Sequence, residues 1–128
     1  MIKYMLDTNI CIYLMEEQPP PVIARFKKCR QGEVVISAVT WAELSCGLDT
    51  HNDGAQFEGL LKAISVLPFD VKAAAAFGRL SQQFPNRKNS FDRMIAAHAV
   101  AANVVLVTNN VSDFAQYGVP LENWTEAT

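Results

Sequence analysis

The sequence predicts a three-layer α/β domain in which helices flank a central, mostly parallel sheet. Short apolar runs rich in β-branched residues alternate with longer helical segments along the chain, which is the pattern of strands joined by crossover helices. The run NVVLVT (103–108) is apolar on both faces, as in strands that helices cover on both sides. Half of the 128 residues are hydrophobic, so we expect residues 1–128 to form one domain.

The alternation of patterns places each element. Three prolines at 19–21 end the first helix, and a proline suits the first turn of the next one. Asp70 is in position to cap the helix that follows it. We expect strands one and four to be neighbours and strand three to lie at an edge. The expected strands are 2–6, 33–39, 65–70, 103–108 and a last edge strand in 119–124; the expected helices are 10–16, 21–29, 40–48, 53–64, 71–84 and 91–102, with a helical turn at 112–117.

Charge and composition exclude several classes of protein. The net charge is −2, so a nucleic-acid partner would need a local basic patch. Three cysteines without a C-x-x-C pair are typical of small apolar side chains in a reducing compartment, and two histidines are too few for a usual zinc site. Asp7 interrupts any signal peptide, and the longest apolar stretch (94–107) is too short to span a membrane. We therefore expect a soluble, cytoplasmic protein.

The chain has no glycine-rich phosphate loop and no G-x-S-x-G motif, which leaves the acidic residues as candidates for chemistry. Asp7 ends the first strand, Glu43 follows the second, Asp92 lies in the first turn of the helix before the fourth, and Asp113 follows the fourth. In a parallel sheet, strand ends and the starts of the helices after them share one rim. We expect the four acids to converge there.

Each acid also has a purely structural interpretation. Asp7 could cap a helix, and Glu43 could be the last residue of a capping box at 40–43. Asp92 could be a first-turn acid, but its helix is apolar on almost all sides, and a carboxylate on a buried stripe must be paired or bind a cation. Crowded acids without basic neighbours favour Mg²⁺ or Mn²⁺. Asp70 also ends a strand; at a sheet edge it would serve only as a cap.

Four segments together resemble the PIN-domain ribonucleases, specifically the VapC toxins of bacterial toxin–antitoxin pairs: MLDTNICIYLM (5–15), ISAVTWAEL (36–44), FDRMIAAHAVAANVVLVTNN (91–110) and SDF (112–114). By position, Asp7, Glu43 and Asp92 match the three principal acids of that family. Relatives often carry a fourth acid where this chain has 108–110 (TNN), and Asp113 is the nearest carboxylate. Relatives also often have a glycine-containing loop where this chain has PNRKNS (85–90).

The resemblance implies a Mg²⁺- or Mn²⁺-dependent endoribonuclease that cleaves structured RNA, with tRNA the commonest target. Asp7 and Asp92 would be metal ligands, Glu43 would orient or deprotonate the attacking water, and Asp113 would be an outer ligand. The side chains expected to support the acids by hydrogen bonds, without binding the metal themselves, are Thr8, Asn9, Thr108 and Asn110. The resemblance also implies a VapB-type antitoxin as partner and a homodimer.

Basic residues near Asp92 are the candidates for contacts with RNA phosphates, namely Arg87, Lys88 and Arg93. The run from Arg25 to Arg30 is interpreted as a solvated helix face. His98 lies off the face of Asp92 and is interpreted as a core or interface histidine, and Trp41 as a packing residue.

Two other classes are alternatives to the toxin. A haloacid-dehalogenase-type phosphatase would need a second Asp where Asn9 stands and a late catalytic lysine, and no lysine follows Lys88. A PIN-type module that only binds its partner would not need the three acids, which are all present.

Overall fold

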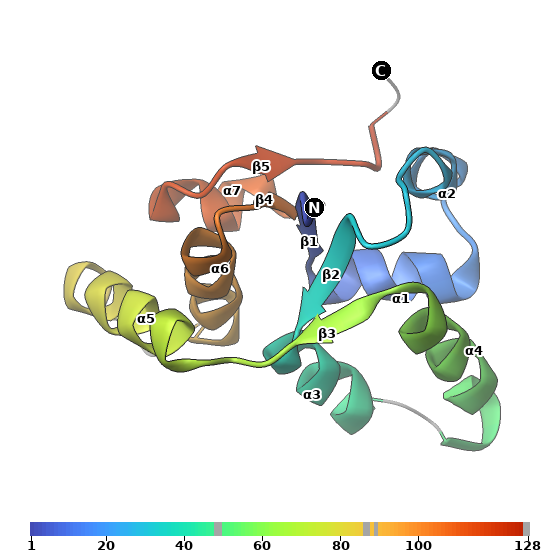
Figure 1. Ribbon diagram of the computed structural model, residues 1–128, viewed down its shortest axis with the longest axis horizontal. Coiled ribbons are helices and arrows are strands. Elements are labelled where there is room, and N and C mark those ends of the chain that lie inside the picture. Colours follow the sequence, from blue (N-terminus) through green and yellow to red (C-terminus); the bar gives the residue numbers. More distant parts are fainter. Residues whose placement is uncertain (48–49, 86–87, 89, 127–128) are drawn as a thin grey trace.

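The computed structural model describes residues 1–47, 50–85, 88 and 90–126. Its centre is a five-stranded sheet in the order β3-β2-β1-β4-β5 (Figure 1). Every neighbouring pair is parallel. The strands are β1 (Tyr4–Leu6), β2 (Val34–Ser37), β3 (Ser65–Leu67), β4 (Val105–Val107) and β5 (Leu121–Glu122). As predicted, β1 and β4 are neighbours and β3 is at an edge.

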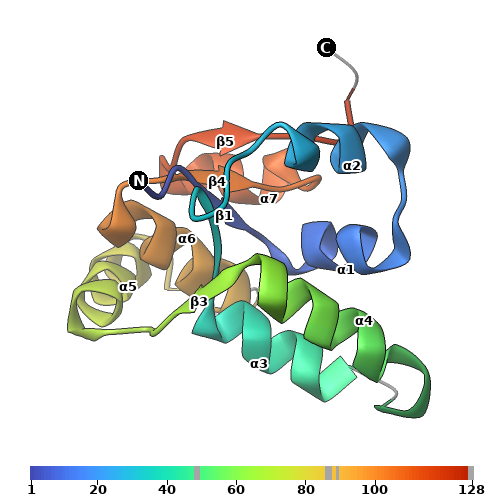
Figure 2. The ribbon, with the colours of Figure 1, turned by 45° about the vertical axis from the view of Figure 1, so that its right-hand side comes forward.

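Helices connect the strands and cover both faces of the sheet. They are α1 (Thr8–Glu16), α2 (Pro20–Lys27), α3 (Ala38–Gly47), α4 (Thr50–Ala63), α5 (Val71–Gln83), α6 (Ser90–Ala102) and α7 (Val111–Phe114), followed by a 3₁₀ turn, η1 (Ala115–Tyr117). Figures 1 and 2 both show α5 and α6 side by side, away from α1, α2 and α4. The predicted three-layer α/β fold is confirmed.

Alternating residues of the central strands divide the core into two halves. Met5 and Val35 pack in one cluster with Ile95 of α6, whereas Leu6 and Ile36 pack in the other with the helices on the opposite face. Neighbouring residues of a strand point to opposite faces of the sheet, so fully apolar strands supply both clusters. The sheet is thereby packed between two helical layers, which fix the positions of the carboxyl ends of its strands.

The boundary between β2 and α3 differs from the prediction. The strand ends at Ser37 and the helix already begins at Ala38, two residues before Thr40. The reason is a cap that the hydrophobic pattern does not show: Ser37 Oγ accepts the N–H of Val39 at 3.1 Å. The capping-box interpretation of 40–43 is therefore wrong, because Thr40 lies inside the helix.

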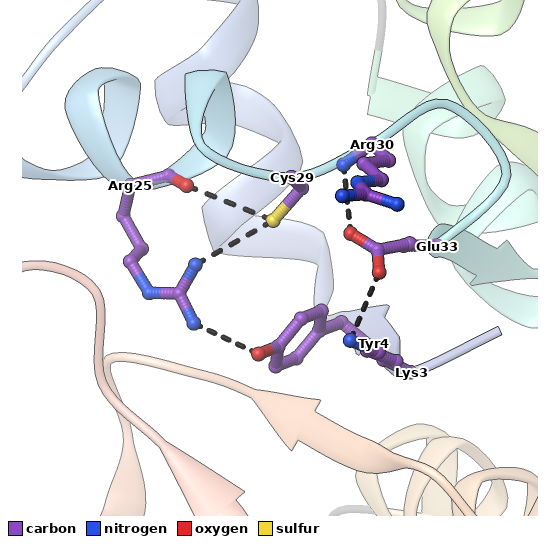
Figure 3. A network of polar contacts seen from close by, with 6 residues as sticks. All are labelled: Lys3, Tyr4, Arg25, Cys29, Arg30 and Glu33. Atoms are coloured by element: carbon purple, nitrogen blue, oxygen red, sulfur yellow. Dashed lines mark hydrogen bonds and ion pairs between the residues drawn. The ribbon is translucent and has the colours of Figure 1, made fainter. Parts of the chain in front are cut away.

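Arg25 on α2 is not part of a solvated face, which corrects the prediction for this position. Its guanidinium donates a hydrogen bond to the Tyr4 hydroxyl at 2.8 Å (Figure 3) and lies 5.1 Å from the ring centre of Trp124. It also forms an ion pair with Glu122 at 3.6 Å. Arg25 thus ties α2 to the start of β1 and to the C-terminal segment.

None of the helices in the described ranges is both long and apolar enough to cross a bilayer.

Candidate active site

Asp7 stands at the junction between β1 and α1. Its backbone N–H continues the sheet by donating to the Val107 carbonyl at 2.9 Å. Its side chain caps α1, because Oδ1 accepts the N–H of Ile10 at 3.0 Å. The other carboxylate oxygen accepts a hydrogen bond from the Thr108 hydroxyl at the end of β4. The helix-cap interpretation is therefore correct, but it accounts for only one of the two oxygens.

The environment of Asp7 opposes its negative charge. Its side chain is buried, with 5% of the residue exposed. Burial is the main reason that its pKa rises from 3.8 to about 6, and the charges of Asp92 and Glu43 raise it further, while the hydrogen bonds from Thr108 and Ile10 lower it. Three of the predicted acids are thus close enough to repel one another, as the parallel rim requires.

Asp92 and Asp113 complete the acidic group. Asp92 is half-buried in the first turn of α6, and its pKa is raised by burial, by Glu43 and by Asp113. Asp113 is exposed in α7, where its backbone N–H donates to the Asn110 carbonyl at 3.0 Å. The structure therefore brings all four predicted acids into one group from four elements.

Glu43 extends from α3 toward α1. Its Oε1 accepts a hydrogen bond from the Thr8 hydroxyl at 2.8 Å, so the two predicted residues are partners. Trp41, on the same helix, packs against Phe57 with ring centres 6.3 Å apart. Glu43 is thus held by a neighbour from the first helix.

The turn after β4 supports the site in two ways. Thr108 is fully buried; its hydroxyl donates to Asp7 and accepts the Asn110 N–H at 2.9 Å. Asn109 accepts from Asn9 at 3.4 Å and donates to the Tyr13 hydroxyl at 2.9 Å. The contribution of Asn110 comes from its backbone, and Asn109 is a supporting residue that the sequence prediction missed. The signal was its place between two predicted residues.

Of the basic residues predicted to contact RNA phosphates, Arg93 is buried. Arg93 is 5% exposed; it donates to Ser81 Oγ at 3.1 Å and lies 5.4 Å from the ring centre of Phe77. It therefore joins α6 to α5, and the prediction that it contacts RNA is wrong, because the apolar face of α6 carries it into the helix interface. Lys88 is exposed, and Arg87 lies outside the described residues.

The donor set suits a small divalent cation. Two ion pairs, between Lys3 and Glu33 and between Arg25 and Glu122, join residues outside the group of four acids. Within the described ranges, no three His, Cys, Asp or Glu side chains lie close enough to hold a metal ion together. Mg²⁺ commonly binds through one or two carboxylates and keeps several waters, so a pair of ligands such as Asp7 and Asp92 fits it.

Comparison with known proteins agrees with this geometry. The family model of the PIN domain matches residues 4–119. The chain is 36% identical to the tRNA(fMet)-specific endonuclease VapC of Shigella flexneri, over 98% of this chain and all of that protein. It is 33% identical to ribonuclease VapC2 of Haemophilus influenzae, over 97% of this chain and 99% of the relative.

Solved structures show the same fold. The DNA-bound VapBC of Salmonella typhimurium superposes with a TM-score of 0.86 at 34% identity, covering 97% of this chain and 99% of that one. VapBC2 of Rickettsia felis, bound to a promoter DNA fragment, gives a TM-score of 0.83 at 30% identity, with 97% and 99% covered. The chain belongs to the PIN domain family and, within it, to the VapC ribonucleases. This membership decides against the phosphatase alternative.

Proposed function

We propose that this protein is a divalent-metal-dependent endoribonuclease toxin that hydrolyses structured RNA, with tRNA as its substrate class. The observation that carries the proposal is the buried carboxylate of Asp7, whose charge is opposed by burial and by two neighbouring acids. A divalent cation at this position would remove that repulsion. The names of the relatives, tRNA-specific endonuclease and ribonuclease, support the RNA substrate.

The four acids have distinct places in the proposed mechanism. Asp7 and Asp92 would hold the cation, which would neutralise phosphate charge and lower the pKa of water. Glu43, fixed by Thr8 at 2.8 Å, orients the attacking water and accepts its proton. Asp113, which is exposed in α7, would be an outer ligand of the cation.

Other side chains keep these groups in place or contact the substrate. Thr108 holds one oxygen of Asp7, so that the carboxylate presents a fixed face to the cation. Asn9 and Asn110 support the same turn through Asn109 and Thr108. Lys88 is exposed close in sequence to Asp92, and we assign it, with Arg87, to phosphate contacts.

The metal and the nucleophile are tested together. Purified protein is incubated with bulk tRNA in chelator, Mg²⁺ or Mn²⁺, and the cleaved ends are mapped. We expect cleavage only with metal, and 5′-phosphate ends, because water attacks the phosphorus. Rapid cleavage in excess chelator with 2′,3′-cyclic phosphate ends would contradict the proposal. Asp7→Asn is the inactive control, and Asp70→Asn, which alters a remote cap on α5, should stay active.

The proposed partner is a VapB-type antitoxin, because the similar solved structures are VapBC complexes. We expect a segment of it to cross the acidic rim and to place an arginine against Asp7 and Asp92, since a guanidinium suits paired carboxylates. The toxin expressed alone should arrest growth, and co-expression of the antitoxin should restore it. Harmless overexpression would contradict this part. We also propose a homodimer, which light scattering of the purified toxin tests.

A further inference from the structure

His98 is a buried polar residue that the proposed mechanism does not use. It lies on α6 with 3% of its surface exposed, which agrees with its predicted place in the core. Its Nδ1 is 2.7 Å from Ser37 Oγ, and its ring meets Phe69 edge-on, with centres 5.4 Å apart. A ring placed only for packing would not need a buried hydroxyl at hydrogen-bond distance.

Ser37 is the residue that starts α3. It is fully buried at the end of β2, and its Oγ accepts the N–H of Val39, the second residue of the helix. This is the hydrogen bond of an N-cap. The partner of His98 therefore fixes where α3 begins and in which direction the helix leaves the sheet.

The tautomer of His98 sets the direction of its hydrogen bond with Ser37. Burial lowers the pKa of the imidazole, with an opposing contribution from Asp70, so the ring is neutral at pH 7. Ser37 Oγ accepts the Val39 N–H, and its second lone pair and its hydroxyl hydrogen let it either accept from His98 Nδ1 or donate to it. In either tautomer, the hydrogen bond joins the ring to the residue that caps α3.

This contact joins the two helices that carry Asp92 and Glu43. Asp92 lies six residues before His98 on α6, about 9 Å along the axis. Glu43 is four residues after Val39, on the same face of α3. We propose that His98, acting through Ser37, is a positioning residue that sets the placement of Glu43 relative to Asp92. The proposal rests on the nuclease function proposed above.

Matched substitutions separate this role from packing. Asn at position 98 can place a hydrogen-bonding amide near the site of Nδ1, whereas Gln reaches toward the site of Nε2 and Leu offers no polar atom. We expect His98→Leu and His98→Gln to lower kcat about tenfold with little change in KM, because a misplaced general base slows the chemical step. His98→Asn should stay within about threefold of the wild type.

Two further measurements connect the effect to α3 and to Glu43. Hydrogen exchange at the Val39 amide should accelerate in His98→Gln and return to the wild-type rate in His98→Asn. In single-turnover assays, His98→Leu should add nothing to Glu43→Gln or to Ser37→Ala, because each of these already removes the group through which His98 acts.

The opposite results would overturn the proposal. These are equal kcat in His98→Gln and the wild type, equal damage in His98→Asn and His98→Gln, or full additivity with Glu43→Gln. If His98→Leu does not fold, the Asn and Gln variants still decide. A wild-type protein that cleaves no RNA would refute the proposed function, whereas an unchanged Val39 exchange rate in His98→Gln would refute the positioning contact.

Discussion

Asp7 combines its role as a helix cap with the metal-binding role proposed above. One oxygen caps α1 through Ile10, and the other is held by Thr108. Both hydrogen bonds favour the charged form, yet burial and the neighbouring acids outweigh them and leave the pKa at about 6. Without a cation, the ionised side chain is therefore a source of instability near neutral pH.

The first prediction concerns the metal-free stability of Asp7→Asn. The pKa of Asp7 is about 6 in the folded protein, against the ordinary value of 3.8 that we take for the unfolded chain. Its contribution to stability is therefore complete below pH 3.8 and is lost as the pH rises through 6. Asn keeps the cap without the charge. At pH 7 in chelator, Asp7→Asn should be more stable than the wild type by up to about 3 kcal/mol, converging below pH 4.

Denaturant unfolding at several pH values measures this difference. Asp70→Asn is the matched control, because Asp70 caps α5 in the same way, accepting the Ala73 N–H at 3.0 Å, but is exposed. Asp70→Asn should be no more stable than the wild type at pH 7. Equal stability of Asp7→Asn and the wild type at pH 7, together with full activity, would mean that Asp7 is only a helix cap.

The second prediction concerns Thr108. Its hydroxyl donates to Asp7 and so lowers the pKa of that carboxyl. Thr108→Val removes the donor, and the pKa should rise further, so that the acid limb of Mn²⁺ binding moves to higher pH. Calorimetric titration from pH 5.5 to 8 measures the shift. Thr8→Val is the control: it removes the hydrogen bond to Glu43, not one to Asp7, and should leave the acid limb in place.

At the scale of the element, the sequence predicted the strands well but set three helix starts late: α1 begins at Thr8, α3 at Ala38 and α4 at Thr50, against predicted starts at 10, 40 and 53. As expected, β1 and β4 are neighbours and β3 lies at an edge of the sheet. The beginning of α3 was set two residues late, since Ser37 looks like a strand residue and only its contact with Val39 shows the cap.

In the candidate site, too, some placements could be predicted from the sequence and others could not. Asp7, Glu43, Asp92 and Asp113 were predictable because the rim of a parallel sheet collects the residues at strand ends. The position of the Arg93 side chain was not predictable. A basic side chain on an apolar helix can point to solvent or into a neighbouring helix, and the neighbour decides which. Arg93 on α6 contacts Ser81 and Phe77 of α5, which lie 12 and 16 positions earlier in the sequence and carry no pattern that predicts the contact.

The third prediction follows from the corrected start of α3. Thr40 lies inside the helix, fully buried, and its Oγ1 has no hydrogen-bond partner among the described residues. Thr40→Val keeps the shape and removes an unsatisfied hydroxyl. We expect the free energy of unfolding to stay equal or to rise by about 1 kcal/mol, with activity retained. Thr108→Val, whose hydroxyl has two partners, is the contrasting variant and should lose stability. A loss of more than about 1 kcal/mol in Thr40→Val would show that the hydroxyl is satisfied.

At the scale of the molecule, the acidic group and the contact of Arg25 with Tyr4 lie at the two ends of β1. Tyr4 begins β1 and Asp7 follows its end, so one short strand connects the two regions. At the starting end, Lys3 pairs with Glu33 at 3.0 Å, and Arg30 N–H donates to the same carboxylate at 2.7 Å (Figure 3). These contacts close the sheet away from the site, where a rigid β1 helps to hold Asp7 still.

The last prediction concerns Arg25, whose guanidinium lies against Tyr4 and Trp124. Because Trp124 follows β5 and is 3% exposed, Arg25 fastens the C-terminal segment over α2 and β1. Arg25→Met keeps much of the apolar contact but loses the hydrogen bond to Tyr4 and the ion pair with Glu122. We expect a loss of about 1–2 kcal/mol in unfolding free energy and faster hydrogen exchange in β5.

Lys28→Met, which changes an exposed neighbour, is the control and should change neither quantity. Because the acids are at the other end of β1, Mn²⁺ affinity should stay within about twofold in both variants. A stable Arg25→Met protein with unchanged β5 exchange would show that apolar packing alone holds the C-terminal segment.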